Sequence, residues 1–108
     1  MIRVLYFSTA QSDISMADVD NIVALSAKKN GERNITGALA YNGRNFCQLL
    51  EGEHAVVKDL LNTIEEDARH TGFKVIDSKE ITDRHFPDWS MMRVDGLDFS
   101  TVINAMNA

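Results

Sequence analysis

Cysteine, proline, basic residues and long hydrophobic runs are all scarce in this sequence. Its 108 residues include one Cys and one Pro, and 11 Lys and Arg face 16 Asp and Glu. A single thiol forms no disulfide within the chain, which favours a reducing cytoplasm. No apolar run approaches the roughly 20 residues of a membrane-spanning helix, and the N-terminus lacks a signal-peptide pattern. The acidic balance argues against a nucleic-acid groove, because phosphate binding requires a surplus of cations.

Patterns typical of metal and phosphate sites are missing as well. His54, His70 and His85 are too widely separated for zinc-ligand spacing. The six glycines are scattered singly and form no phosphate-binding loop. Cys47 is expected to be a small buried apolar residue rather than a nucleophile. None of these patterns points to an enzyme.

Strand and helix patterns alternate along the chain, whose 44% hydrophobic content is that of an ordinary globular domain. Hydrophobic patterning predicts five strands, at residues 2–7, 35–41, 46–50, 73–81 and 89–94. Helical spacing predicts three helices, at residues 15–30, from 51–53 to 70–72, and at 97–106. Ser15 and Asp18 resemble a capping box at the start of the first helix, and Asn30-Gly31 is its expected end. Asn42-Gly43 predicts a hairpin.

The order of these elements is βαββαββ, followed by a small helix. Right-handed crossovers place the first two helices on the same face of a mixed five-stranded sheet. We therefore predict a ferredoxin-like α+β sandwich. Residues 1–95 are expected to form one domain, and residues 96–108 a short C-terminal helix or cap.

Three polar residues stand out against this pattern. Gln48 shares a strand face with Phe46 and Leu50, and an unpaired buried amide costs about 1–3 kcal/mol, so Gln48 needs partners. Bonding to neighbouring backbone, or a place at a sheet edge, satisfies that need without any function. Tyr6 also needs a partner for its hydroxyl if it is buried, but most such tyrosines are core residues. Asn30 is explained by spacing alone as a helix stop.

Five segments, taken together and in order, resemble the BLUF family, the blue-light sensors that use FAD. They are residues 4–8 (VLYFS), 34–41 (NITGALAY), 46–52 (FCQLLEG), 67–70 (DARH) and 86–91 (FPDWSM). Each segment alone is a weak signal, whereas all five at the family's spacing are specific. The resemblance extends from about residue 2 to residue 91.

The resemblance implies an FAD ring held edge-in between the first two helices, against the sheet. By this match, Gln48 would bridge Tyr6 and the flavin N5/O4 edge, and Asn30 would hold the O4/N3 side. Ile22 and Ile64 would sandwich the ring. These roles agree with a flat ring that has apolar faces and a polar edge.

Four further positions match residues that contact the rest of the cofactor in the family. Lys29, Asp67, Arg69 and His70 would lie near the far edge of the ring, the ribityl chain or the phosphates. Family members vary at the position of Lys29.

The resemblance implies a photoreceptor without turnover. Tyr6 would pass an electron and a proton towards the photoexcited flavin through Gln48. The Gln48 amide is then left rotated or tautomerised, which gives a small red shift that decays in the dark. Trp89 and Met91, which would otherwise be core residues, would exchange places near Gln48. The output is expected to act in the cytoplasm on a separate effector protein or a homo-oligomer, and not on nucleic acid or a membrane.

Two other functions compete with this interpretation. A light-insensitive interaction domain of the same fold would not need Tyr6, Asn30 and Gln48 together, so their joint presence argues against it. An acylphosphatase-like hydrolase requires an Arg in the loop after the first strand, and residues 8–15 contain none.

The outer face of the sheet is expected to be only partly covered. Family members usually continue with two helices on this face, whereas residues 97–108 provide barely one. Leu5, Phe7 and Leu49 would then be undercovered, which invites a dimer or a partner.

Overall fold

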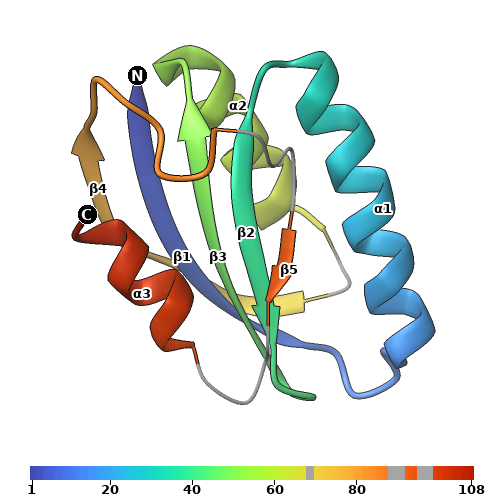
Figure 1. Ribbon diagram of the computed structural model, residues 1–108. Helices are drawn as coiled ribbons and strands as arrows, with labels where there is room; N and C mark the ends of the chain where they lie inside the picture. Colours follow the sequence, from blue (N-terminus) through green and yellow to red (C-terminus); the bar gives the residue numbers. More distant parts are fainter. Residues whose placement is uncertain (68–69, 88–91, 95–98) are drawn as a thin grey trace.

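The computed structural model describes residues 1–67, 70–87, 92–94 and 99–108. Along the chain the elements are β1 (Ile2–Ala10), α1 (Met16–Glu32), β2 (Thr36–Tyr41), β3 (Asn45–Gly52), α2 (His54–Glu65), β4 (His70–Glu80), β5 (Met92–Val94) and α3 (Ser100–Met106) (Figure 1). The α+β class predicted from the sequence is confirmed. Within the described residues, none of the helices has the length and apolar character needed to cross a bilayer.

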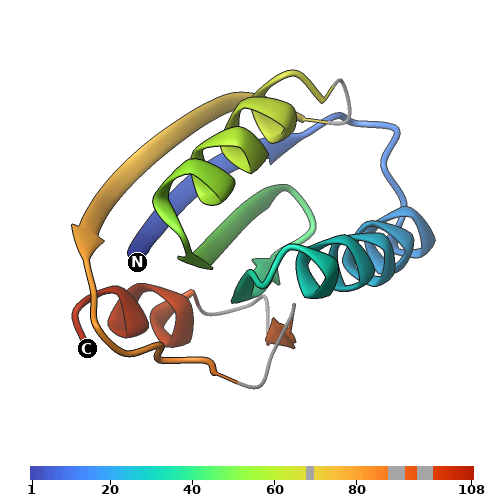
Figure 2. The same cartoon turned by 90° about the horizontal axis from the view of Figure 1, so that it is seen from above.

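The sheet is built around the antiparallel pair of β1 and β3. Its strand order is β4-β1-β3-β2-β5. The first four strands of this order pair antiparallel, and the short β5 lies parallel to β2. α1 and α2 lie on one face of the sheet and α3 on the other, which is visible in Figure 2.

Alternation along the strands divides the apolar residues between two cores. The inner core, under α1 and α2, contains the buried residues Val4, Tyr6, Val19, Ile35, Leu39, Tyr41, Phe46, Leu50 and Val57. The outer core, under α3, contains Leu5, Ala38, Ala40, Cys47, Leu49, Phe86, Val102, Ala105 and Met106. Consecutive residues of one strand therefore serve opposite faces of the sheet.

The outer face is better covered than the sequence suggested. Leu5 and Leu49 are 3% and 0% exposed, so the expectation that they would be undercovered is wrong. The reason is that α3, although only 7 residues long, presents Val102 and its apolar neighbours to the sheet, and Phe86 fills the remaining space. Phe7 is half-buried and packs against Phe99, with ring centroids 6.0 Å apart.

α1 begins as predicted and ends later than predicted. The capping box is confirmed, because Ser15 accepts from the Asp18 backbone and the Asp18 carboxylate accepts from the Ser15 backbone. The helix does not stop at Asn30-Gly31 but continues to Glu32. The left-handed turn falls instead on Asn34, at φ 58°, and asparagine tolerates this conformation better than most residues.

α2 ends at Glu65, five residues or more before the predicted end at residues 70–72. β4 starts correspondingly early, at His70 rather than at residue 73, and runs to Glu80. The cause is the length of β1, whose pairing with β4 extends from Ile2 opposite Glu80 to Ala10 opposite His70. Backbone pairing over that whole length outweighs the local helical pattern.

β4 lies at one end of the sheet and pairs irregularly with β1. The register shifts between Leu5 and Tyr6 and again between Phe7 and Thr9. Such shifts are β-bulges, which leave an extra residue on one strand and increase the local twist.

The structure describes only part of the last predicted strand and of the last predicted helix. Met92–Val94 form β5, and Ser100–Met106 form α3. Residues 89–91 of the predicted strand and residues 97–98 of the predicted helix lie outside the described residues.

Gly37 is expected to be essential for the packing of β2 against β3. A Cβ atom at this position would lie 1.9 Å from the carbonyl oxygen of Leu49, a backbone atom that cannot move aside. Gly37→Ala should therefore lower the free energy of unfolding by about 3 kcal/mol, the upper end of over-packing costs. Chemical denaturation measures this loss.

Gly43→Ala is the control, because a Cβ there meets nothing within 4 Å and only the positive φ of 95° opposes it. This variant should lose about 1 kcal/mol. Equal losses in the two variants would contradict the close approach of β2 and β3 at Gly37.

Candidate functional site

A cleft opens on the inner face, between α1, α2 and the sheet. Its lining residues are Tyr6, Ser8, Ile22, Leu25, Ser26, Lys29, Asn30, Leu39, Phe46, Gln48, Leu60, Thr63, Ile64 and Asp67. β1, β2 and β3 supply the floor, and the two helices supply the walls.

Tyr6 and Gln48 form a hydrogen-bonded pair at the floor of the cleft. They lie directly opposite each other in the register of β1 and β3. The Tyr6 hydroxyl donates to Oε1 of Gln48, and the two residues are only 4% and 5% exposed. The Tyr6 side chain is therefore one of the polar partners that the sequence required for the Gln48 amide.

Burial determines the protonation of the groups around this pair. Desolvation by burial raises the pKa of Tyr6 well above its usual value, and neighbouring Cys47 and Asp67 raise it further. Tyr6 thus keeps its proton and remains a hydrogen-bond donor to Gln48. Burial also raises the pKa of the Cys47 thiol to about 12. This neutral thiol belongs to the outer core, as expected from its strand parity.

Both apolar and polar side chains line the cleft. Ile22 of α1 and Ile64 of α2 supply apolar side chains to its two helical walls. Asn30 lies deep in the cleft, at 1% exposure, whereas Lys29 is exposed and Asp67 is half-buried. A planar apolar ligand with a polar edge matches this distribution.

The structure brings together most of the residues singled out from the sequence. Tyr6, Gln48, Ile22, Lys29, Asn30, Ile64 and Asp67 all line the cleft. His70 begins β4, and only its backbone is described. Arg69, Trp89 and Met91 lie outside the described residues.

Sequence reasoning missed several residues of the lining, including two serines. Ser8 is two residues after Tyr6 and shares its strand face, because β1 continues to Ala10 instead of ending at residue 7. Ser26 is four residues before Asn30 and therefore lies one helical turn away on the same face of α1. The periods of strand and helix were the signals that pointed to both positions.

Comparison with known proteins identifies the family. The sequence model of BLUF, described as sensors of blue light using FAD, matches residues 1–92. The chain belongs to the BLUF family. A photoactivated adenylate cyclase subunit beta from Euglena longa is 31% identical over 87 residues, which is 80% of this chain and 10% of that protein. This chain therefore spans about a tenth of the length of that curated relative.

Two solved structures have the same fold. The dark-state structure of BlrB, a BLUF protein, superposes with a TM-score of 0.85 at 34% identity, covering 93% of this chain and 76% of that one. A bacterial light-regulated adenylyl cyclase superposes with a TM-score of 0.84 at 37% identity, covering 88% of this chain and 28% of that one.

The cleft residues fit the isoalloxazine ring of a flavin. Ile22 and Ile64 offer apolar surfaces for the two faces of the ring, and the Asn30 amide offers both a donor and an acceptor to its edge. The Ser8 hydroxyl is buried without a hydrogen-bond partner in the part of the chain that is described. Because buried polar groups are normally paired, this orphaned hydroxyl is best explained by a polar group within the cleft.

The raised pKa of Tyr6 predicts a loss of stability at alkaline pH. In the unfolded chain Tyr6 ionises near pH 10, whereas in the folded chain it keeps its proton. Above about pH 10 the folded state therefore binds more protons than the unfolded state. The contribution of Tyr6 to stability is complete below about pH 10 and falls by roughly 1.4 kcal/mol per pH unit above it.

Urea denaturation between pH 8 and 11 measures this effect, and Tyr6→Phe provides the comparison because it has no hydroxyl to ionise. The difference in stability between the two proteins should shift in favour of the variant as the pH rises. Parallel pH profiles would contradict the burial of the Tyr6 hydroxyl.

Proposed function

We propose that this domain binds FAD in the cleft between α1 and α2 and acts as a blue-light photoreceptor. The observation that carries the proposal is the hydrogen bond from Tyr6 to Gln48 at the floor of a cleft whose two helical walls each supply an isoleucine. Membership of a family described as sensors of blue light using FAD supports the same function.

Each residue of the cleft has a proposed role towards the cofactor. Gln48 would bridge Tyr6 and the N5/O4 edge of the ring, and Asn30 would bind the O4/N3 side. Ile22 and Ile64 would hold the ring between them. The position of Ser8 beside Tyr6 on β1 supports a further hydrogen bond to the ring or to a water at its edge.

The outer end of the cleft suits the remainder of the cofactor. Lys29 and Asp67 line the cleft and are not fully buried, which favours contacts to the ribityl chain or the phosphates. Arg69 and His70 follow Asp67 in the sequence, and we assign them to the same part of the cofactor. Cationic side chains there would offset the charge of the pyrophosphate in a chain of formal net charge −5.

The proposed photochemistry needs one donor and one switchable amide. The bound flavin supplies the absorption of blue light and the acceptance of an electron. Tyr6 would give up this electron, and its hydroxyl proton would follow through Gln48, along the existing hydrogen bond. When the electron and the proton return to Tyr6, the Gln48 amide would be left rotated or tautomerised, with altered hydrogen bonds. Gln48 is thus the element with two arrangements that light biases.

The output of this domain is proposed to be a change of contacts and not a turnover reaction. Trp89 and Met91 would report the state of Gln48. In the bacterial light-regulated cyclase the region matched by this chain is 28% of a longer protein. We propose that residues 1–95 are the sensor, with ferredoxin-like topology, and that residues 96–108 cap it. A separate cytoplasmic effector protein or a second copy would receive the signal.

The absorption spectrum of the purified protein, in the dark and under blue light, tests the proposal. A flavin spectrum that shifts slightly to the red and returns in darkness is expected. A colourless protein that cannot be loaded with FAD would overturn the proposal and leave a light-insensitive interaction domain of the same fold.

Gln48→Leu should retain flavin but lose the reversible red shift, because the leucine has no amide to rearrange. Tyr6→Phe should behave in the same way, since it lacks the donor hydroxyl. Gln11→Leu is the control, because Gln11 is exposed in the loop after β1 and does not line the cleft. A normal red shift in the Gln48→Leu protein would refute the mechanism.

Asn30→Ala should weaken flavin retention. Loss of two hydrogen bonds to the ring edge costs about 1–3 kcal/mol, which corresponds to a roughly 5- to 150-fold increase in Kd. Equilibrium dialysis against FAD measures the change. Asn21→Ala is the matched control, because Asn21 is exposed on the same helix. Equal affinities in the two variants would remove Asn30 from the site.

A further inference from the structure

A buried ion pair joins β1 and β3 on the outer face of the sheet. Arg3 Nε donates to Oε2 of Glu51 over 2.9 Å, and the two side chains are only 4% and 0% exposed. Removing two charges from water is costly, and the cost is offset only when further hydrogen bonds satisfy both groups. The further hydrogen-bond partners of Arg3 and Glu51 therefore show which segments this ion pair holds in place.

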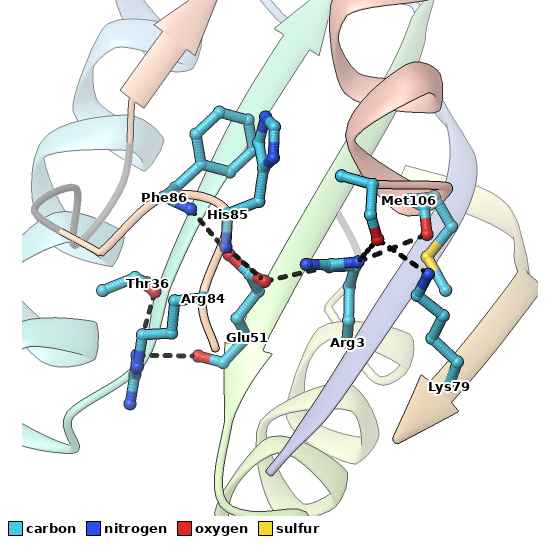
Figure 3. Close-up of polar contacts among 9 residues, drawn as sticks. Arg3, Thr36, Glu51, Lys79, Arg84, His85, Phe86 and Met106 are labelled. Carbon is cyan, nitrogen blue, oxygen red and sulfur yellow. Dashed lines mark hydrogen bonds and ion pairs between the residues drawn. The ribbon is translucent and has the colours of Figure 1, made fainter. Parts of the chain in front are cut away.

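The carboxylate of Glu51 also binds the backbone of the segment that leads towards β5. Its Oε2 accepts from the amide of His85 and its Oε1 from the amide of Phe86, each over 2.9 Å (Figure 3). A guanidinium and two backbone amides thus satisfy the carboxylate. The side chain of Phe86, fixed in this way, belongs to the outer core with Val102 and Met106 of α3.

Two arginines extend this network to other elements. Arg3 Nη1 donates to the carbonyl oxygens of Met106 and Ala108, over 3.5 and 3.0 Å, at the end of α3. Arg84 Nη1 donates to the backbone oxygen of Glu51, over 3.1 Å, and to Oγ1 of Thr36 on β2, over 2.9 Å. The Arg3–Glu51 pair is therefore a junction of β1, β3, α3 and residues 84–86 (Figure 3).

The junction lies on the same two strands as the Tyr6–Gln48 pair. In the register of β1 and β3, Tyr6 is opposite Gln48 and Arg3 is opposite Glu51. The two pairs are three residues apart and so project from opposite faces of the sheet. A shift of β3 that accompanies a rearrangement of the Gln48 amide would reach Glu51 through a single stretch of strand.

We propose that Glu51 is a positioning residue that transmits the state of the Tyr6–Gln48 pair to residues 84–86 and α3. This inference rests on the proposed function, because it requires Gln48 to have two arrangements. The backbone of β3 carries the displacement, and the Glu51 carboxylate thereby changes its hydrogen bonds to the His85 and Phe86 amides. α3 follows because Phe86 and Arg3 both contact it.

Amide hydrogen exchange followed by NMR, in the dark and under blue light, tests this role in the flavin-loaded full chain. In the wild-type protein, light should change the exchange rates of the His85 and Phe86 amides and of the α3 amides at least 3-fold. In Glu51→Gln one acceptor oxygen becomes an NH₂ donor, so the dark protection of His85 or Phe86 should fall about 10-fold. The light-dependent change in α3 should disappear, while the red shift of the flavin remains.

Glu53→Gln is the matched control, because Glu53 is exposed and only two residues away. It should leave the exchange rates and their light dependence unchanged. If Glu51→Gln does not fold, Arg3→Met with Glu51→Gln removes both charges and leaves neither unpaired. The double variant should show the same loss of dark protection and of the response in α3.

The outcomes separate this inference from the proposed function. If α3 still responds to light in the Glu51 variants, Glu51 does not have this role. The role is also overturned if the flavin absorption of the wild-type protein shifts while the exchange rates of the His85 and Phe86 amides do not change. A wild-type protein without a reversible red shift overturns the proposed function, and with it the transmission of a light-induced change to α3. In that case the dark exchange rates still show whether Glu51 holds residues 84–86.

Discussion

The antiparallel pairing of β1 with β3 is the constraint on which the rest of the structure depends. Alternation of side chains along these two strands puts Tyr6 and Gln48 on the face covered by α1 and α2. The same alternation puts Arg3 and Glu51 on the face covered by α3. One ladder of backbone hydrogen bonds thus fixes the geometry of a buried neutral pair and of a buried charged pair.

The two faces of the sheet solve different physical problems. The inner face leaves a cleft whose floor carries polar groups, and Ser8 has an unpaired buried hydroxyl among the described residues. The outer face is closed by apolar contacts and by the carboxylate of Glu51, whose two oxygens both accept hydrogen bonds. The inner face therefore offers polar groups to a ligand, whereas the polar groups of the outer face are already bonded within the protein. Ligand binding and structural support are thus separated between the two faces.

Local patterns predicted the strands and helices well but did not predict their ends. Gln48 was recognisable because an amide in an apolar row requires a partner. The resemblance to the BLUF family pointed to Tyr6, and the register of β1 and β3 places the two side chains opposite each other. The proposed role of Asn30 came from the resemblance to the BLUF family, since spacing alone made it a helix stop. Glu51 was placed at the start of the second predicted helix, whereas it lies in β3. Its amide partners lie more than thirty residues away in an irregular segment. Interactions of that kind depend on tertiary structure and have no local period.

The irregular pairing of β4 determines how another molecule can approach this side of the domain. A long, flat edge strand offers unpaired amides and carbonyls to any extended chain, and such edges lead to uncontrolled assembly. The two register shifts twist β4 away from that geometry, and the exposed Lys74 adds a charge to it. A protein that docks at this edge would therefore meet a bulged, charged strand and not a flat row of unpaired amides and carbonyls.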